Sequence, residues 1–132
     1  MRRLVMLVTL FVALLAGCGR GQSPSIGNDK ASGPPKTELT VVAKNTAFEP
    51  TSLTAAAGKD LTITFRNEDT TAHSFHLFGG TAGEVKTDVK PGPSSDTLHV
   101  TLQVPASYNF QCDVHPSVMK GTVVVVKERV ST

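Results

Sequence analysis

The sequence predicts an all-β domain, a sandwich or barrel of about seven short strands. After position 38, runs rich in Val, Thr and Ile recur at a spacing of roughly ten residues, and Gly, Pro or Asn separate them. Several runs alternate apolar and polar residues, which is the period of a half-buried strand. The same region shows no helical period of apolar residues. Short strands with regular turn signals therefore favour a small β-domain.

The first segment of the chain predicts an export signal. Arg2 and Arg3 precede an apolar run, Leu4 to Ala16, which ends in small residues before Cys18. This build is typical of a secretory signal peptide, and the run is short for a membrane-spanning helix. We therefore expect residues 1–17 to be a signal peptide.

The tetrad Leu15-Ala16-Gly17-Cys18 resembles the lipobox of bacterial lipoproteins. The resemblance implies cleavage before Cys18 and lipidation of its thiol and new amino group. Each buried methylene of an acyl chain contributes about 0.8 kcal/mol, so more than one chain gives a stable anchor. The protein is then expected in the cell envelope, lipid-anchored on the periplasmic side or the outer surface.

Residues 18–37 predict a flexible linker, because Gly, Ser, Pro and polar residues dominate and Ile26 is the single large apolar residue. The chain has 13 basic and 11 acidic residues, and Arg2 and Arg3 belong to the signal. The mature chain therefore carries 13 − 2 = 11 basic against 11 acidic residues. Such a balance offers no basic stripe and argues against nucleic acid as a partner.

The domain is expected over residues 38–132. Phe48 is expected in its core, Gly58-Lys59 as a turn, and Gly79 to Pro93 as a long loop. The strands are expected at Leu39–Lys44, Ser52–Ala56, Leu61–Phe65, His73–Phe78, Thr97–Val104, Tyr108–Gln111 and Gly121–Val126.

The chain has two cysteines, Cys18 and Cys112, and we expect them to be modified differently. A disulfide would be the first guess in an exported protein. An acylated Cys18 cannot form one, so Cys112 is a lone thiol in an oxidising compartment. Such a thiol is a liability unless it is buried or bound to metal.

Three metal-ligating side chains lie close together between two expected strands: Cys112, His115 and Met119. Soft sulfur ligands select copper or zinc, and imidazole suits both metals. A loop whose ends are held in a sheet can direct all three toward one point. His73 is the best candidate for a fourth ligand, because it opens a strand after a polar turn.

The cluster is similar to the C-terminal ligand loop of the cupredoxin (blue-copper) family, as in plastocyanin, amicyanin and pseudoazurin. Met119-Lys-Gly-Thr-Val also resembles the strand that follows this loop. Phe48-Glu-Pro-Thr-Ser-Leu, and Asn67 through His73, resemble the region of the first histidine. The resemblance covers residues 38–127.

The resemblance implies a two-sheet Greek-key β-sandwich of seven to eight strands and one type 1 copper per chain. The implied ligands are His73, Cys112, His115 and Met119, with Met119 as the long axial ligand. Ser74 would connect the two ligand loops. The exposed edge of His115 would pass electrons, and Pro116 and Val118 would form a small docking patch for a transient redox partner.

Three residues separate His115 from Met119, a spacing between those of amicyanin and plastocyanin. The spacing therefore leaves the copper geometry and reduction potential open. His76 and His99 are expected not to bind metal. His76 should face away from His73, because three positions along a strand reverse the face.

Two functions stay open: electron transfer by a monomer, and copper delivery or buffering in the envelope. Met119 is the single methionine after the signal, and there is no Met- or His-rich tract, which disfavours delivery. An enzyme is not expected, because four histidines cannot supply further copper sites.

Overall fold

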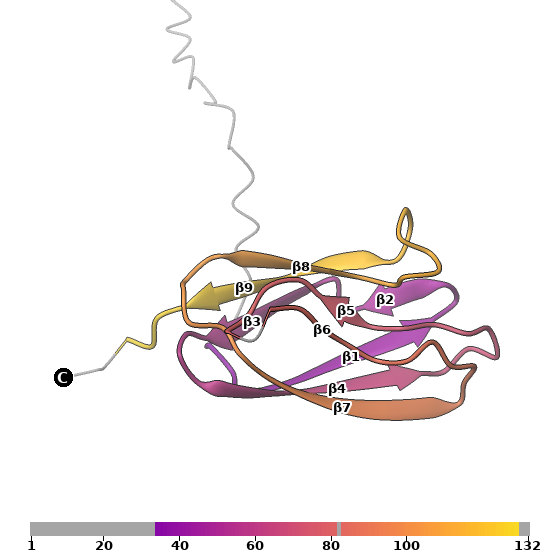
Figure 1. Cartoon of the computed structure of the whole chain (residues 1–132), viewed down its shortest axis with the longest axis horizontal. Helices are drawn as coiled ribbons and strands as arrows, with labels where there is room; N and C mark the ends of the chain where they lie inside the picture. The colour runs from indigo at the N-terminus through magenta and orange to yellow at the C-terminus, as the bar shows by residue number, and fades with distance from the viewer. Residues whose placement is uncertain (1–33, 82, 130–132) are drawn as a thin grey trace, which may run out of the picture.

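The computed structural model describes residues 34–81 and 83–129 as two β-sheets packed face to face (Figure 1). The first sheet has the strand order β2-β1-β4-β7 and the second has the order β3-β9-β8-β5-β6. All regular elements in these ranges are strands. The predicted all-β sandwich is therefore confirmed. The strands are β1 (Glu38–Lys44), β2 (Ala47–Glu49), β3 (Ser52–Ala56), β4 (Asp60–Asn67), β5 (His76–Leu77), β6 (Val85–Lys86), β7 (Ser94–Thr101), β8 (Ser107–Gln111) and β9 (Lys120–Val126).

Two parallel pairs connect distant parts of the chain. β1 pairs in parallel with β4, and β3 pairs in parallel with β9. The other neighbours are antiparallel, including the β8–β9 hairpin, in which Gln111 lies opposite Lys120. This hairpin holds both ends of the segment 112–119 in one sheet.

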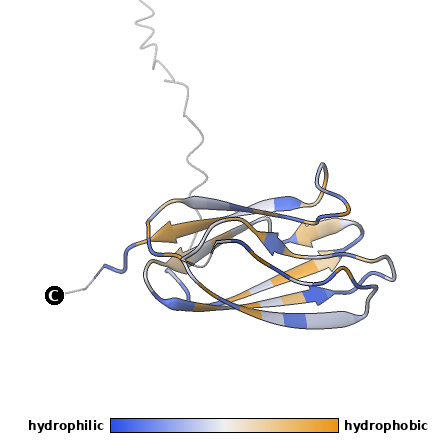
Figure 2. Ribbon diagram, in the orientation of Figure 1, coloured by the Kyte–Doolittle hydropathy of each residue, from blue (hydrophilic) through white to orange (hydrophobic). Residues whose placement is uncertain are grey.

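Alternating burial places the apolar side chains between the sheets. Along β4, Leu61, Ile63 and Phe65 are buried, while the residues between them are partly exposed. Figure 2 shows apolar and polar residues interspersed along the strands. The core contains a cluster of aromatic rings with centroid separations of 5.1–6.3 Å. Its members are Phe48, Phe65, Phe75 and Phe110.

The segment expected as a strand over 73–78 pairs as a strand at His76–Leu77 alone. His73 instead forms an isolated bridge with Lys90, its N–H donating to the Lys90 carbonyl at 3.1 Å. The expectation of a continuous strand was wrong because His73 pairs through an isolated bridge, whereas His76–Leu77 pairs with β6 on one side and with β8 on the other. That long segment also contains the short strand β6, which composition did not indicate.

Other strand boundaries also differ from expectation, most of all those of β7. β7 ends at Thr101, not Val104, and begins at Ser94, because its partner β4 extends from Asp60 to Asn67. β2, which composition did not indicate either, pairs with β1 across the turn at Asn45 and Thr46.

Lys36 and Thr37 already belong to the hydrogen-bonded structure. Lys36 lies beside Ala55, and the Thr37 carbonyl accepts from Thr62 N–H at 2.8 Å. The expected signal peptide, Cys18 and most of the expected linker lie outside the described residues. Within 34–81 and 83–129, no helix has the length and apolar character to cross a membrane.

Candidate metal centre

The loop between β8 and β9 carries three of the expected ligands at one end of the sandwich (Figure 1). The Cys112 N–H donates to the Met119 carbonyl at 2.9 Å, which closes the neck of the loop. His115 receives the N–H of Met119 at 2.9 Å and that of Val118 at 3.2 Å on its carbonyl. These bonds form a compact turn that holds the side chains in place.

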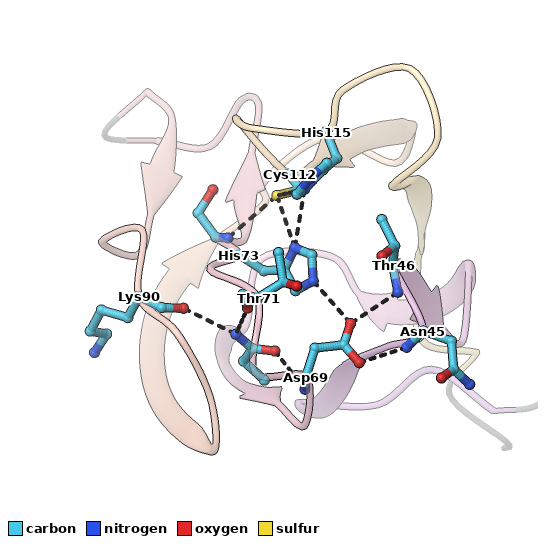
Figure 3. Close-up of polar contacts among 10 residues, drawn as sticks. Asn45, Thr46, Asp69, Thr71, His73, Lys90, Cys112 and His115 are labelled. Carbon is cyan, nitrogen blue, oxygen red and sulfur yellow. Dashed lines mark hydrogen bonds and ion pairs between the residues drawn. The ribbon is translucent and has the colours of Figure 1, made fainter.

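His73 approaches the same point from the segment between β4 and β5. Its bridge with Lys90 fixes the backbone, and its side chain is fully buried. Figure 3 shows the His73 ring directed at Cys112 and His115. The His73 Nδ1 atom lies 3.8 Å from the Cys112 sulfur and 3.2 Å from the His115 Nδ1 atom.

His73, Cys112 and His115 form a cluster that can hold one metal ion, which we call the metal group. One ligand atom from each lies within 4.8 Å of the others, and Cys112 and His73 are buried. The His115 Nδ1 atom is 3.8 Å from the Cys112 sulfur. Two imidazoles and a thiol around one point suit a soft transition metal such as copper. The donor set therefore fits a copper ion.

Met119 is the expected axial ligand. It is fully buried, and its carbonyl binds the Cys112 N–H at the neck of the loop. Its thioether is a soft donor of the kind that copper accepts.

Ser74 connects the two segments that carry the ligands. Its hydroxyl accepts from the Asp113 N–H at 3.0 Å, and its own N–H donates to the Cys112 sulfur at 3.5 Å. Ser74 is fully buried. One residue beside His73 therefore contacts both Cys112 and its neighbour in the loop.

The family model for the cupredoxin-like domain matches residues 6–125. The chain belongs to the cupredoxin-like family. This confirms the resemblance drawn from the ligand loop and the first-histidine region.

This cupredoxin is similar in sequence to an auracyanin and in fold to auracyanins and amicyanin. Auracyanin-A of Chloroflexus aurantiacus is 29% identical over 157 aligned residues, which cover 95% of this chain and 97% of the relative. The fold is similar to that of a reduced auracyanin from Roseiflexus castenholzii, with a TM-score of 0.63 and 20% identity over 70% of this chain and 98% of that one. A reduced amicyanin variant gives a TM-score of 0.54 and 24% identity over 68% of this chain and 83% of that one.

His76 lies outside the metal group of this cupredoxin, although it is almost fully buried. Its Nδ1 atom is 2.7 Å from Asp113 Oδ1, and its ring stacks on Phe78 at 4.2 Å. Its Nε2 atom lies 3.1 Å from Glu84 Oε2 without the alignment of a hydrogen bond. His76 thus holds the ligand loop from outside.

His99 lies on the outer face of the β4–β7 pair. Its side chain is 63% exposed, and its Nδ1 atom is 3.5 Å from Thr62 Oγ1. His99 therefore has no part in the metal group.

Sequence reasoning missed Asp69, which touches the far side of the His73 ring at 3.0 Å between Oδ2 and Nε2. The Thr46 N–H holds the pKa of Asp69 below its ordinary value of 3.8, and bonds from Asn45 and His73 act in the same direction, whereas desolvation opposes them. An acidic residue in a turn four positions before a candidate histidine ligand is the signal that was available.

Proposed function

We propose that this cupredoxin carries single electrons through one type 1 copper held by His73, Cys112, His115 and Met119. The observation that carries the proposal is the convergence of two imidazoles and a buried thiol within 4.8 Å. The Cu(II)/Cu(I) couple supplies the one-electron chemistry. Membership of the cupredoxin-like family supports copper as the metal, and so does the similarity in fold to auracyanin A, a "blue" copper protein.

The residues supply rigidity and shielding. Three of the four proposed ligands come from one loop whose neck is closed by the bond from Cys112 N–H to the Met119 carbonyl. His73 is fixed from the other segment by its backbone bridge to Lys90. Ligands that move little between the Cu(II) and Cu(I) states keep the reorganisation energy of electron transfer low. This arrangement suits an electron carrier, not an enzyme.

Electrons would pass through His115, the most accessible of the proposed ligands. Pro116 is exposed beside it, and Val114 and Val118 are 48% and 64% exposed. Exposed apolar side chains around a partly exposed imidazole suit a small, transient interface with a redox protein.

The first test is a titration of the full chain in detergent with Cu(II), followed by visible and paramagnetic-resonance spectroscopy. We expect an intense thiolate-to-copper band that saturates at one copper per chain and is bleached reversibly by ascorbate. A weak band with tight Cu(I) binding would support copper delivery instead, and no metal binding would refute both.

We also propose that the chain acts outside the cytoplasm, anchored to a membrane through an acylated Cys18. The lipobox-like tetrad and the Gly/Ser/Pro-rich residues up to position 37 support this proposal. Mass spectrometry of the N-terminal peptide should show an acylated Cys18, and Cys18→Ala should move the protein to the soluble fraction. An unmodified Cys18 on a chain that keeps residues 1–17 would contradict the anchor.

A further inference from the structure

The two nitrogens of the His73 ring face different partners. Nδ1 faces the other two members of the metal group and lies 3.8 Å from the Cys112 sulfur. Nε2 faces Asp69 Oδ2 at 3.0 Å. Figure 3 shows Asp69 on the opposite side of the ring from Cys112. A neutral imidazole that offers the Nδ1 lone pair to a metal carries its proton on Nε2. Asp69 accepts that proton in a hydrogen bond, which selects this tautomer.

Asp69 is itself held in place by the turn between β1 and β2. The Asn45 N–H donates to its Oδ1 atom at 2.7 Å, and the Thr46 N–H donates to its Oδ2 atom at 2.9 Å. Both residues have positive φ, 53° for Asn45 and 56° for Thr46. Two successive amides thus point at one carboxylate, and they favour its charged form.

Asn67 fixes the backbone of Asp69. Its side-chain oxygen accepts from the Asp69 N–H at 3.0 Å, and its amide nitrogen donates to the carbonyls of Thr71 and Lys90 at 2.9 and 3.0 Å. Asn67 is 1% exposed. Lys90 is also the backbone partner of His73, so one network fixes the ligand and the carboxylate together.

We propose that Asp69 is a positioning residue that orients His73 toward copper and lowers the reduction potential of the site. The proposal rests on the ligand assignment made under the proposed function. Hydrogen-bonded carboxylates fix the orientation of ligating histidines and make them better electron donors. A negative charge beside a ligand stabilises Cu(II) more than Cu(I), because Cu(II) carries one more positive charge. The Asp69 side chain is 16% exposed, so solvent screens this interaction only in part.

The test compares Asp69→Asn with Asp96→Asn in the full chain, purified in detergent and loaded with copper. Both variants remove one negative charge, but Asp96 pairs with Lys90 Nζ and does not touch a proposed ligand. The readouts are the midpoint potential and the thiolate-to-copper band. We expect Asp69→Asn to keep the band and to shift the redox equilibrium constant toward Cu(I) by about three- to tenfold, or roughly 30–60 mV at 59 mV per decade. Asp96→Asn should shift it by much less.

Equal shifts of the midpoint potential in the two variants would show that net charge alone causes the effect, and this would overturn the proposal. An unchanged potential in Asp69→Asn would overturn it as well. Nitrogen-15 NMR of the Cu(I) proteins gives a second readout. The His73 Nε2 proton should exchange slowly with solvent in the wild type and faster in Asp69→Asn, and equal exchange rates would overturn the proposal. An intact band in His73→Ala would instead refute the ligand assignment itself.

Discussion

At the scale of single residues, Cys112 combines full burial with contacts to both histidines of the metal group. Its sulfur lies 3.8 Å from the Nδ1 atoms of His73 and His115 and receives the Ser74 N–H at 3.5 Å. A buried thiol in such surroundings can bind a metal once it is deprotonated.

Cys112→Ser should therefore abolish the intense visible band, because the band arises from charge transfer from the thiolate to Cu(II) and the variant has no thiolate at this position. Visible spectroscopy of the copper-loaded variant measures the loss. His99→Ala is the matched control for a metal-binding side chain, since His99 is exposed on the other sheet and should leave the band intact. An unchanged band in Cys112→Ser would show that the thiol is not a ligand.

Met119 is expected to act on the potential more than on the fold. Leu has nearly the same volume, and swaps that conserve volume in a core generally cost less than about 1.5 kcal/mol. Removing the thioether takes away a weak donor to Cu(II), so Met119→Leu should keep the band and raise the midpoint potential by roughly 60–120 mV, a ten- to hundredfold change in the redox equilibrium. Voltammetry measures the shift, and a potential equal to that of the wild type would exclude Met119 as an axial ligand.

At the scale of elements, the β8–β9 hairpin provides the frame of the ligand loop. Gln111 and Lys120 pair at its base, and Gly121 leaves room for the Phe110 ring. A Cβ atom at position 121 would come within 2.3 Å of Phe110 and 2.5 Å of the Thr51 carbonyl oxygen. The glycine in the Met-Lys-Gly stretch therefore has a packing role beneath the metal group.

The connection between the two ligand segments depends on Ser74. Ser74→Ala leaves the Asp113 N–H without its acceptor, and an unsatisfied donor costs about 1–3 kcal/mol when buried, with the lower end expected for this partly buried group. We expect a lower urea midpoint for the metal-free protein and faster release of copper to a chelator.

Ser107→Ala on β8 is the matched control, because Ser107 is exposed. Indistinguishable urea midpoints and release rates for the two serine variants would show that the hydrogen bond from Asp113 does not support the loop.

At the scale of the whole molecule, the metal group joins parts of the chain that are far apart in sequence. Residues 39 positions apart meet where Cys112 contacts His73. A metal that binds the folded chain but not the unfolded one stabilises the fold by about 2.7 kcal/mol at a hundredfold excess over its Kd. For a domain of this size, each 1 kcal/mol raises Tm by about 4–8 °C.

Calorimetry of the full chain should therefore show Tm rising by about 10–20 °C on adding copper in that excess. Cys112→Ser should lose most of this increase, because copper would lose its thiolate ligand. An equal increase in the variant and the wild type would place the stabilising copper at another site.

Local patterns in the sequence were sufficient to predict the fold class and the content of the ligand loop. Alternation along Leu61–Phe65 and the β-branched run Gly121–Val126 are local signals, and a strand that buries one face must show them. Cys112, His115 and Met119 lie in one loop between two strands, so their proximity also follows from local order.

The surroundings of His73, in contrast, were visible only in the tertiary structure. The Lys90 bridge and the Asn45 and Thr46 amides that hold Asp69 come from segments far from His73 in sequence, whereas Asp69 itself lies four positions before it. These contacts depend on how the two sheets pack and on where the 79–93 segment pairs. No periodic pattern encodes such choices, because a polar residue in a turn has the same local signature whether it faces water or a ligand.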